Sequence, residues 1–425
     1  MFKFLNNKEA KNAIWLIAGK VVQMILTLIV GVLSARYLGP DNYGLLHYGT
    51  AWITFFCAFS NLGINSIIVK DFFDNPNEQG KTLGSAILLR FISSILSAII
   101  VIGSVFLING NEPLTIAVVA LQSLGLIFNI FEIINYWFQS QYKSKITSIA
   151  LVIAYIASSV YKIILLSLDK DVRWFAFATS VDHIAMAIFL WTAYKKHNGP
   201  PLSFSWQKAK SLLKSSYHYI LSTTMVAIYS QTDKIMLKEM LSEAEVGYYS
   251  VSTGICAMWV FVLTAIIDSM YPTILKLHSC DSDGFKKKNK QLYAIVFYIS
   301  SAVSILFVLF GDFGINLVYG KAYIPAATTL KIVTWYTAFS YLGVARNAWI
   351  VSEGKQKYLK YMYCGAAIIN VVLNLVLIPV MGASGAALAS LITQVFTSII
   401  LPMCIKEMRP NAKLMLEAIV FKGVF

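Results

Sequence analysis

The chain has 425 residues, of which 57% are hydrophobic and only 13% are charged. Soluble domains average about 45–50% apolar and about 25% charged residues, so the composition excludes an ordinary water-exposed globular protein. The net charge of +14 does not indicate nucleic-acid binding, because the lysines stand in short clusters between apolar blocks and not along one soluble face.

Apolar blocks long enough to cross a hydrocarbon layer about 30 Å thick follow one another along the chain. The predicted helices are 12–35, 43–69, 83–109, 113–139, 146–168, 174–194, 216–240, 246–274, 292–319, 329–352, 358–380 and 383–405. The first block contains Lys20 and Gln23 and is longer than the 7–15-residue core of a signal peptide, so we expect it to be retained. The sequence therefore predicts about twelve membrane crossings.

These helices divide into two halves of six. Residues 38–44, Leu-Gly-Pro-Asp-Asn-Tyr-Gly, align at an offset of 203 with residues 241–247, Leu-Ser-Glu-Ala-Glu-Val-Gly. Both segments are predicted polar turns between the first and second helices of a half, and an even helix number makes the repeat parallel. We predict an all-α integral membrane protein with these parts: a bundle at 1–195, a cytoplasmic linker at 196–215, a bundle at 216–405 and a cytoplasmic tail at 406–425.

The orientation follows from the positive charges, which are retained on the cytoplasmic side of a membrane. With the N-terminus inside, 24 of the 35 Lys and Arg residues fall in inner segments and 7 fall in outer loops. The inner segments include Lys3 and the two longest predicted links, 195–215 and 275–291. Both termini are therefore predicted to be cytoplasmic.

Three separate stretches carry a family resemblance. Residues 35–44, Ala-Arg-Tyr-Leu-Gly-Pro-Asp-Asn-Tyr-Gly, resemble the first-loop signature of Wzx-type polysaccharide flippases. Residues 233–237 with 245–249 are similar to the seventh helix and following turn of that family, and 382–387 are similar to the opening of its last helix. These stretches resemble, in the expected order, the oligosaccharide-flippase branch of the multidrug/oligosaccharidyl-lipid/polysaccharide exporter superfamily.

The resemblance implies two six-helix bundles that move an undecaprenyl-diphosphate-linked oligosaccharide from the inner to the outer leaflet by alternating access. It implies a role in O-antigen, lipopolysaccharide or capsule biosynthesis at the bacterial cytoplasmic membrane. The expected partners are the lipid-linked oligosaccharide, membrane lipids and, further, a polysaccharide polymerase and a chain-length regulator. No cofactor, metal or nucleic acid is expected, and the five cysteines show neither a metal spacing nor a disulfide framework.

Cations inside the predicted helices are the candidate substrate site. A charge at mid-bilayer costs about 2.5–3.5 kcal/mol on insertion scales, so such a residue usually faces a cavity, a partner or a polar boundary. Lys20, Arg90 and Arg346 lie about 12, 10 and 9 Å inside the predicted inner boundary, where they would bind a diphosphate headgroup. Lys162, about 9 Å from the outer boundary, would receive it. The alternative is snorkelling, or pairing with Glu132 or Asp268.

Two further groups of residues are candidates for coupling and for sugar contact. Asp182 and His183 in the sixth helix, together with Glu132, would carry a coupling proton, although a satisfied polar pair between helices explains them equally well. Tyr136 and Trp137 would stack on sugar rings, or would anchor the helix at the membrane interface.

Two other function classes compete with a flippase. A membrane polysaccharide polymerase would require a sizeable outer loop, and the chain has short outer loops and none of the common hydrolase or phosphate-binding motifs. A multidrug or cation exporter would require acidic residues in the first bundle, where the first helix has Lys20 and no carboxylate; Glu132, Asp182, Asp233 and Asp268 keep that alternative open. We therefore predict a transporter and not an enzyme.

Overall fold

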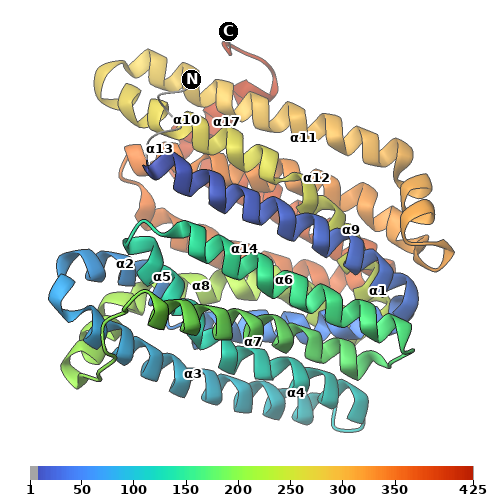
Figure 1. Cartoon of the computed structure of the whole chain (residues 1–425). Coiled ribbons are helices and arrows are strands. Elements are labelled where there is room, and N and C mark those ends of the chain that lie inside the picture. Colours follow the sequence, from blue (N-terminus) through green and yellow to red (C-terminus); the bar gives the residue numbers. More distant parts are fainter. Residues whose placement is uncertain (1–7, 425) are drawn as a thin grey trace. The chain divides into compact units, whose positions relative to one another are not determined.

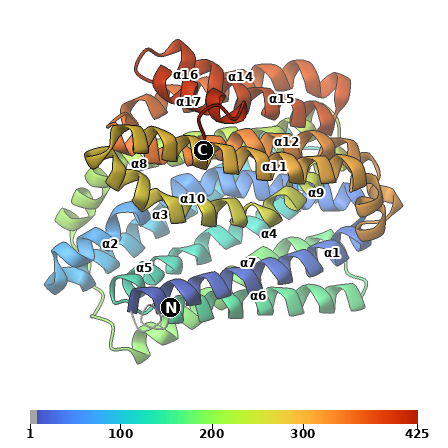
Figure 2. The same ribbon diagram turned by 90° about the horizontal axis from the view of Figure 1, so that it is seen from above.

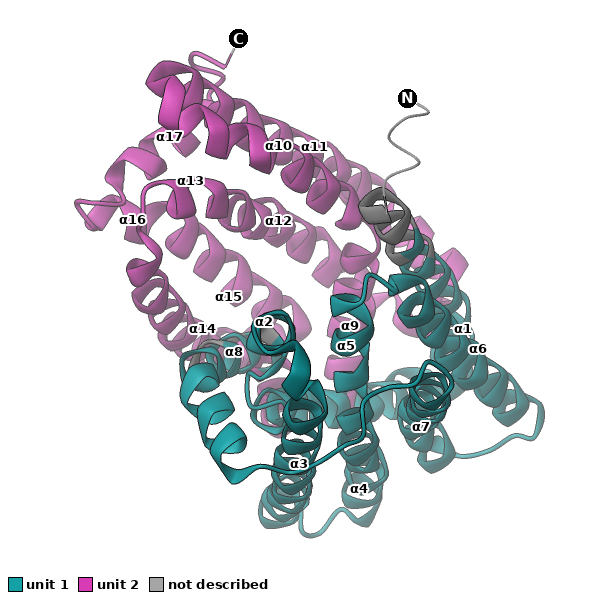
Figure 3. Ribbon diagram, turned by 60° about the vertical axis from the view of Figure 1, so that its left-hand side comes forward, with its two compact units in different colours: residues 1–231 teal, residues 232–425 magenta. Residues whose placement is uncertain are grey.

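The computed structural model describes residues 8–424, together with their side chains except those of residues 8–14, 16–18, 66, 221, 222 and 229. Lys3, counted above among the inner charges, lies outside the described residues. All regular structure within the described range is helical. The chain forms two compact units, residues 1–231 and 232–425 (Figure 3).

The first unit is a bundle of long apolar helices and short connecting turns. Its elements are α1 (Lys8–Ser60), α2 (Asn65–Asp74), η2 (Pro76–Glu78), α3 (Gln79–Ile108), α4 (Pro113–Phe128), η3 (Asn129–Glu132), α5 (Ile133–Ser140), α6 (Ser144–Ser167), α7 (Val172–Lys196) and most of α8 (Trp206–Met240). Helix α3 packs against α4, and α7 packs against both α4 and α6 (Figures 1 and 2). The predicted linker becomes helical at Trp206.

Helix α1 covers the first predicted helix and the second as far as Ser60, and the predicted turn between them is a kink. Gly39 has φ 71° and ψ 172°, a conformation that is accessible to glycine because it has no Cβ. Pro40 follows directly and cannot donate the backbone hydrogen bond of a helix interior, so the kink falls here. The Gly-Pro pair that resembles the family signature therefore changes the direction of the helix.

The fourth predicted helix is interrupted. Helix α4 ends at Phe128, the 3₁₀ turn η3 follows, and α5 continues the chain. Buried apolar residues of α5, among them Ile133, Trp137 and Phe138, pack with Ile64 and Leu212 in one hydrophobic core cluster. The interruption places polar residues of η3 inside the bundle.

The second unit repeats this helical construction. Its elements are the end of α8, α9 (Glu243–Trp259), α10 (Phe261–Cys280), α11 (Ser282–Val318), η4 (Lys321–Tyr323), α12 (Pro325–Ala345), α13 (Asn347–Ser352), η5 (Gln356–Tyr358), α14 (Leu359–Met381), α15 (Ala383–Val395), the π-helix η6 (Phe396–Ile400), α16 (Leu401–Cys404) and α17 (Arg409–Ile419). Helix α12 packs against α9, α11 and α15, and α14 packs against α15.

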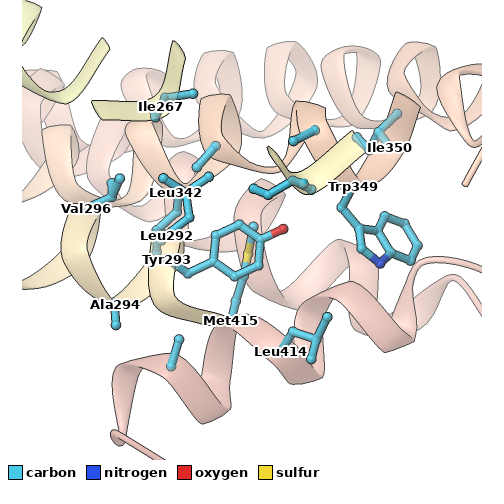
Figure 4. Packing of buried hydrophobic residues seen from close by; sticks show 14 of the residues in the cluster. Ile267, Leu292, Tyr293, Ala294, Val296, Leu342, Trp349, Ile350, Leu414 and Met415 are labelled. Carbon is cyan, nitrogen blue, oxygen red and sulfur yellow. The ribbon is translucent and has the colours of Figure 1, made fainter. Parts of the chain in front are cut away.

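The segment predicted as a tail contains α17, which packs against α11. Met415 and Tyr293 lie together in the core of the second unit with Leu292 and Leu342 (Figure 4). The Asn411 side chain donates a 2.7 Å hydrogen bond to the Tyr293 hydroxyl, and so satisfies a polar group inside this core.

Eight described helices, or nine if the bent pair α9 and α10 counts as one crossing, are long and apolar enough to span a membrane. All twelve predicted segments fall largely on helical backbone, and the all-helical membrane fold is confirmed; the number of crossings stays a prediction. The expected long link at 275–291 is wrong. Helix α10 continues to Cys280 and α11 begins at Ser282, because lysine-rich polar residues extend a helix beyond the apolar layer.

Candidate functional site

A buried arginine lies at the centre of the first unit. The Arg90 side chain in α3 has no solvent-exposed surface, yet its Nη2 atom donates to the Asn61 side chain, to the Asn129 side chain at 2.6 Å and to the Asn129 carbonyl at 3.2 Å. Asn61 lies in the turn after α1, and Asn129 opens η3. The helix ends at these two interruptions leave polar groups inside the bundle, and buried polar groups need hydrogen-bond partners. Arg90 supplies such a partner at both.

The same amide connects Arg90 to two predicted coupling residues. Asn129 Nδ2 donates to Glu132 Oε2 at 2.9 Å and lies 3.5 Å from Nδ1 of His183. The imidazole of His183 packs against Gly125 of α4, where a Cβ atom would come within 3.0 Å of the ring. The structure therefore brings together Arg90, Glu132 and His183, which we call the Arg90 cluster together with Asn61 and Asn129.

The other predicted charged residues of the first unit differ in their exposure. Asp182 is half-buried, and its Oδ1 atom is buried without a hydrogen bond to the described residues. Lys162 in α6 is half-buried and interacts electrostatically with Asp182. Lys20 in α1 is exposed, in contrast to the buried Arg90. Among the four predicted headgroup cations, Lys20 is therefore the most accessible.

The two candidates for sugar contact have different environments. Trp137 is only 4% exposed; its Nε1 donates to Gln79 Oε1 at 3.0 Å, and its ring packs edge-on against Phe138 and Tyr194. Tyr136 is half-buried and within electrostatic reach of the Arg90 cluster. In this conformation Trp137 is a core residue, and Tyr136 alone of the two has surface to offer a ligand.

Arg346 in the second unit resembles Arg90 in its surroundings. It is 5% exposed, lies where α12 ends, and donates through Nη1 to the Thr397 carbonyl at 3.1 Å. Thr397 lies in the π-helix η6, and the wider turn of a π-helix disrupts the regular backbone hydrogen bonding. Both buried arginines therefore donate to a backbone carbonyl at a helix irregularity.

Sequence reasoning missed a polar network around Asp233. Its carboxylate accepts hydrogen bonds from the Tyr249 hydroxyl at 2.5 Å, from Asn374 at 2.6 Å and from Ser390 at 2.6 Å, and all four side chains are buried. Asn370 donates to Ser390 and accepts from Asn374. The signal that could have found it is the Asn370 and Asn374 pair, two amides one helical turn apart in an apolar helix.

Two stretches that carry the family resemblance meet in the second unit. Glu245 Oε2 accepts a 2.5 Å hydrogen bond from the backbone N–H of Ala383, at the start of α15. The carboxylate packs against Gly382, whose φ of 58° favours glycine. A carboxylate at a helix N-terminus is stabilised by the helix dipole, so this contact explains why the two stretches carry Glu and Gly-Ala.

The Arg90 cluster is the candidate functional site of the first unit. No group of three His, Cys, Asp or Glu side chains suited to a metal occurs in the described part of the chain. The Arg90 cluster combines a cation, a carboxylate and an imidazole within an apolar bundle, where electrostatic effects are strong. Ionisable residues inside membrane proteins often carry protons or bind anions, so this cluster is a candidate for such a role.

Comparison with known proteins places this fold. A family model described as "Polysaccharide biosynthesis protein" matches residues 10–278. The capsular polysaccharide biosynthesis protein CapF of Staphylococcus aureus is 21% identical over 393 residues, which cover 90% of this chain and 96% of CapF.

Solved structures share the whole fold at low sequence identity. The lipid II flippase MurJ, in an inward closed conformation, has a TM-score of 0.71 at 16% identity, covering 97% of this chain and 92% of MurJ. An inward-facing multidrug resistance MATE family transporter of the MOP superfamily has a TM-score of 0.74 at 15% identity, covering 92% and 95%. The predicted all-helical membrane fold is therefore confirmed, and the chain shares it with these two proteins.

Proposed function

Because this chain belongs to the polysaccharide biosynthesis protein family, we propose that it is a flippase for lipid-linked oligosaccharides, and not an enzyme. It moves an undecaprenyl-diphosphate-linked repeat unit from the inner to the outer leaflet of the bacterial cytoplasmic membrane by alternating access. The product supplies a surface polysaccharide such as O-antigen or capsule. A polysaccharide polymerase and a chain-length regulator would act on the flipped unit.

The observation that carries this proposal is the family match over residues 10–278, on a chain with at least eight helices suited to span a membrane. The fold alone does not decide between a flippase and a multidrug exporter, because MurJ and MATE structures resemble it equally well. The family match favours a glycan over a drug, and so ranks the flippase above the multidrug exporter.

The residues divide into three proposed roles. Lys20 offers its ammonium to the diphosphate, since it is an exposed cation on an apolar helix. Lys162 receives the headgroup later in the cycle, and Tyr136 contacts the sugar. Arg90 and Arg346 bind the protein's own amides and carbonyls. In this conformation their role is to stabilise the helices, and not to contact the substrate.

Proton coupling is proposed for Glu132, His183 and Asp182. Asn129 links the first two through one amide, and the buried Oδ1 of Asp182 has a vacant acceptor site. A proton that binds one of these groups changes the charge facing Arg90, which gives the bundle a way to sense the proton gradient.

Deletion of the gene in its own host tests the function. We expect the surface polysaccharide to be lost and its lipid-linked repeat unit to accumulate in the inner leaflet, with both defects reversed by the wild-type gene. Surface polysaccharide at the normal level, together with a new sensitivity to toxic cations, would contradict the flippase and favour the exporter.

A further inference from the structure

The first unit has an apolar pocket that the proposed headgroup path does not use. Its volume is about 520 Å³, within the range of about 300–1,000 Å³ that is usual for ligand sites. The walls come from α3, from the end of α4 with η3, and from the segment between α7 and α8. Four of its lining residues are the phenylalanines Phe91, Phe128, Phe131 and Phe204.

The inter-helix segment is held firmly against α3 beside this pocket. Gly84 has no room for a Cβ atom, which would come within 2.9 Å of the Ser203 backbone nitrogen. Ser203 N donates to the Gly80 carbonyl at 3.3 Å, and the Ser85 hydroxyl exchanges hydrogen bonds with the backbone of Ser205. Leu202 and Phe204 are thereby held in the pocket wall as fixed parts of the unit.

The pocket lies along the first half of α3, one of the helices long and apolar enough to span a membrane. Helix α3 begins at Gln79, and Phe91 lies about 18 Å along the helix from that start. Leu88, Phe91 and Phe204 are exposed, so the pocket opens on the side where an integral membrane protein faces lipid chains. An apolar pocket that opens there suits a hydrocarbon chain.

Exposed lysines flank the wall segment of this pocket in the sequence, in the part of the chain predicted to be cytoplasmic. Lys195 and Lys196 end α7 just before the wall segment, and Lys210 and Lys214 follow it on α8; all four are exposed. The exposed Trp206 stands between them, as interfacial anchors do. A chain with a phosphorylated head would place its phosphates among these lysines while its hydrocarbon entered the pocket.

We propose that this pocket binds the polyisoprenoid chain of the lipid-linked substrate. The inference rests on the proposed function and adds a site for the lipid tail beside the headgroup path. The branched, unsaturated chain packs against the four phenylalanine rings, and the fixed 202–204 segment forms one wall. Binding the tail here keeps the carrier on the protein while the head crosses the membrane.

Photo-cross-linking of the full chain in proteoliposomes of phosphatidylethanolamine and phosphatidylglycerol tests this site. The probe is a polyprenyl phosphate with a diazirine on its isoprenoid chain, and the labelled peptides are identified by mass spectrometry. We expect label on peptides 84–91 and 202–204, removed by excess unlabelled polyprenyl phosphate but not by excess phosphatidylglycerol.

Leu88→Trp puts a larger side chain into the pocket, and we expect it to lower the labelling about tenfold, as loss of one apolar contact predicts. Leu96→Trp is the matched control, because Leu96 is exposed on the same helix outside the pocket, and it should label like the wild type.

Equal competition by phosphatidylglycerol would overturn the proposal, since the pocket would then hold ordinary bilayer lipid. Absence of label from both peptides would overturn it too. Complementation of the deletion strain separates the two proposals: a wild-type protein that restores surface glycan but labels elsewhere leaves the flippase standing and removes the tail site.

Discussion

Lys20 is exposed and the two arginines are buried, so we propose that Lys20 binds the headgroup and that the arginines support the fold. We expect Lys20→Ala to keep the protein at its normal level in the membrane while surface glycan falls at least about tenfold, the loss of about 1.4 kcal/mol of headgroup binding. Lys20→Arg should retain most of the function because the charge remains. Quantitative blotting and glycan staining check both; normal glycan in Lys20→Ala would remove Lys20 from the path.

Arg90→Ala should act mainly on stability. It leaves Asn61 and Asn129 inside the bundle without their cation and opens a cavity in α3, at a cost of about 3 kcal/mol. The expected result is a lower midpoint of thermal unfolding of the detergent-purified protein and less protein in the membrane. An unchanged midpoint with lost transport would instead make Arg90 a substrate ligand.

In the second unit, we expect removal of Asp233 from its polar network to lower stability in the same way. Asp233→Ala leaves the Tyr249, Asn374 and Ser390 donors buried without their acceptor, which should cost about 3 kcal/mol and lower the unfolding midpoint. The matched control is Asp268→Ala, since Asp268 is exposed and should leave the midpoint within a degree or so of the wild type.

At the scale of elements, a comparison of two glycine substitutions in α3 distinguishes the effect of packing from that of helix propensity. Gly84→Ala forces the 202–204 segment away from α3, whereas Gly103→Ala adds a methyl group where nothing lies within 4 Å. Both changes raise helix propensity by about 0.8–1 kcal/mol, so a difference between them measures the contact. We expect limited proteolysis to cut Gly84→Ala between α7 and α8 and to leave Gly103→Ala intact.

The attachment of α17 to α11 should depend on pH. Lys290 Nζ lies 2.5 Å from Glu417 Oε2, and this hydrogen bond lowers the pKa of Glu417 below its ordinary value. The stabilisation is therefore fully present above about pH 4.3, the pKa of a free Glu side chain, and is lost as the pH falls through the lower folded-state pKa. Because Glu417 is partly exposed, we expect at most about 0.5 kcal/mol.

Hydrogen exchange of the α17 amides checks this prediction. Exchange corrected for its intrinsic rate should become faster from pH 6 to pH 3 in the wild type. Glu417→Gln should show faster exchange at pH 6 already and a smaller change with pH. An identical pH response in both proteins would show that other carboxylates control this helix.

The elements themselves could be predicted from the sequence largely because apolar blocks of membrane length have only one regular backbone available. The local irregularities could not. Polar residues open η3 at Asn129, and the π-helix at Phe396–Ile400 has an apolar sequence that reads as ordinary helix. Their stability comes from Arg90 and Arg346, which are distant in the sequence. The Asp233 network was missed for the same reason, since it joins α8, α9, α14 and α15.

At the scale of the whole molecule, the orientation can be tested with a native thiol. Cys280 is exposed at the end of α10, in a lysine-rich segment predicted to be cytoplasmic. A membrane-impermeant maleimide should label it in inside-out vesicles and not in intact spheroplasts. Cys280→Ser supplies the background from the remaining cysteines. Labelling in spheroplasts would invert the predicted topology.

The most direct measurement is translocation by the purified chain in proteoliposomes that contain a polyprenyl-diphosphate-linked oligosaccharide. A glycosidase trapped on one side reports how fast the sugar appears there. The flippase account predicts a protein-dependent rate well above that of empty liposomes, sharply reduced by Lys20→Ala and retained by Leu96→Trp. A rate equal to that of empty liposomes, from protein that exchanges a cationic drug for protons, would contradict it.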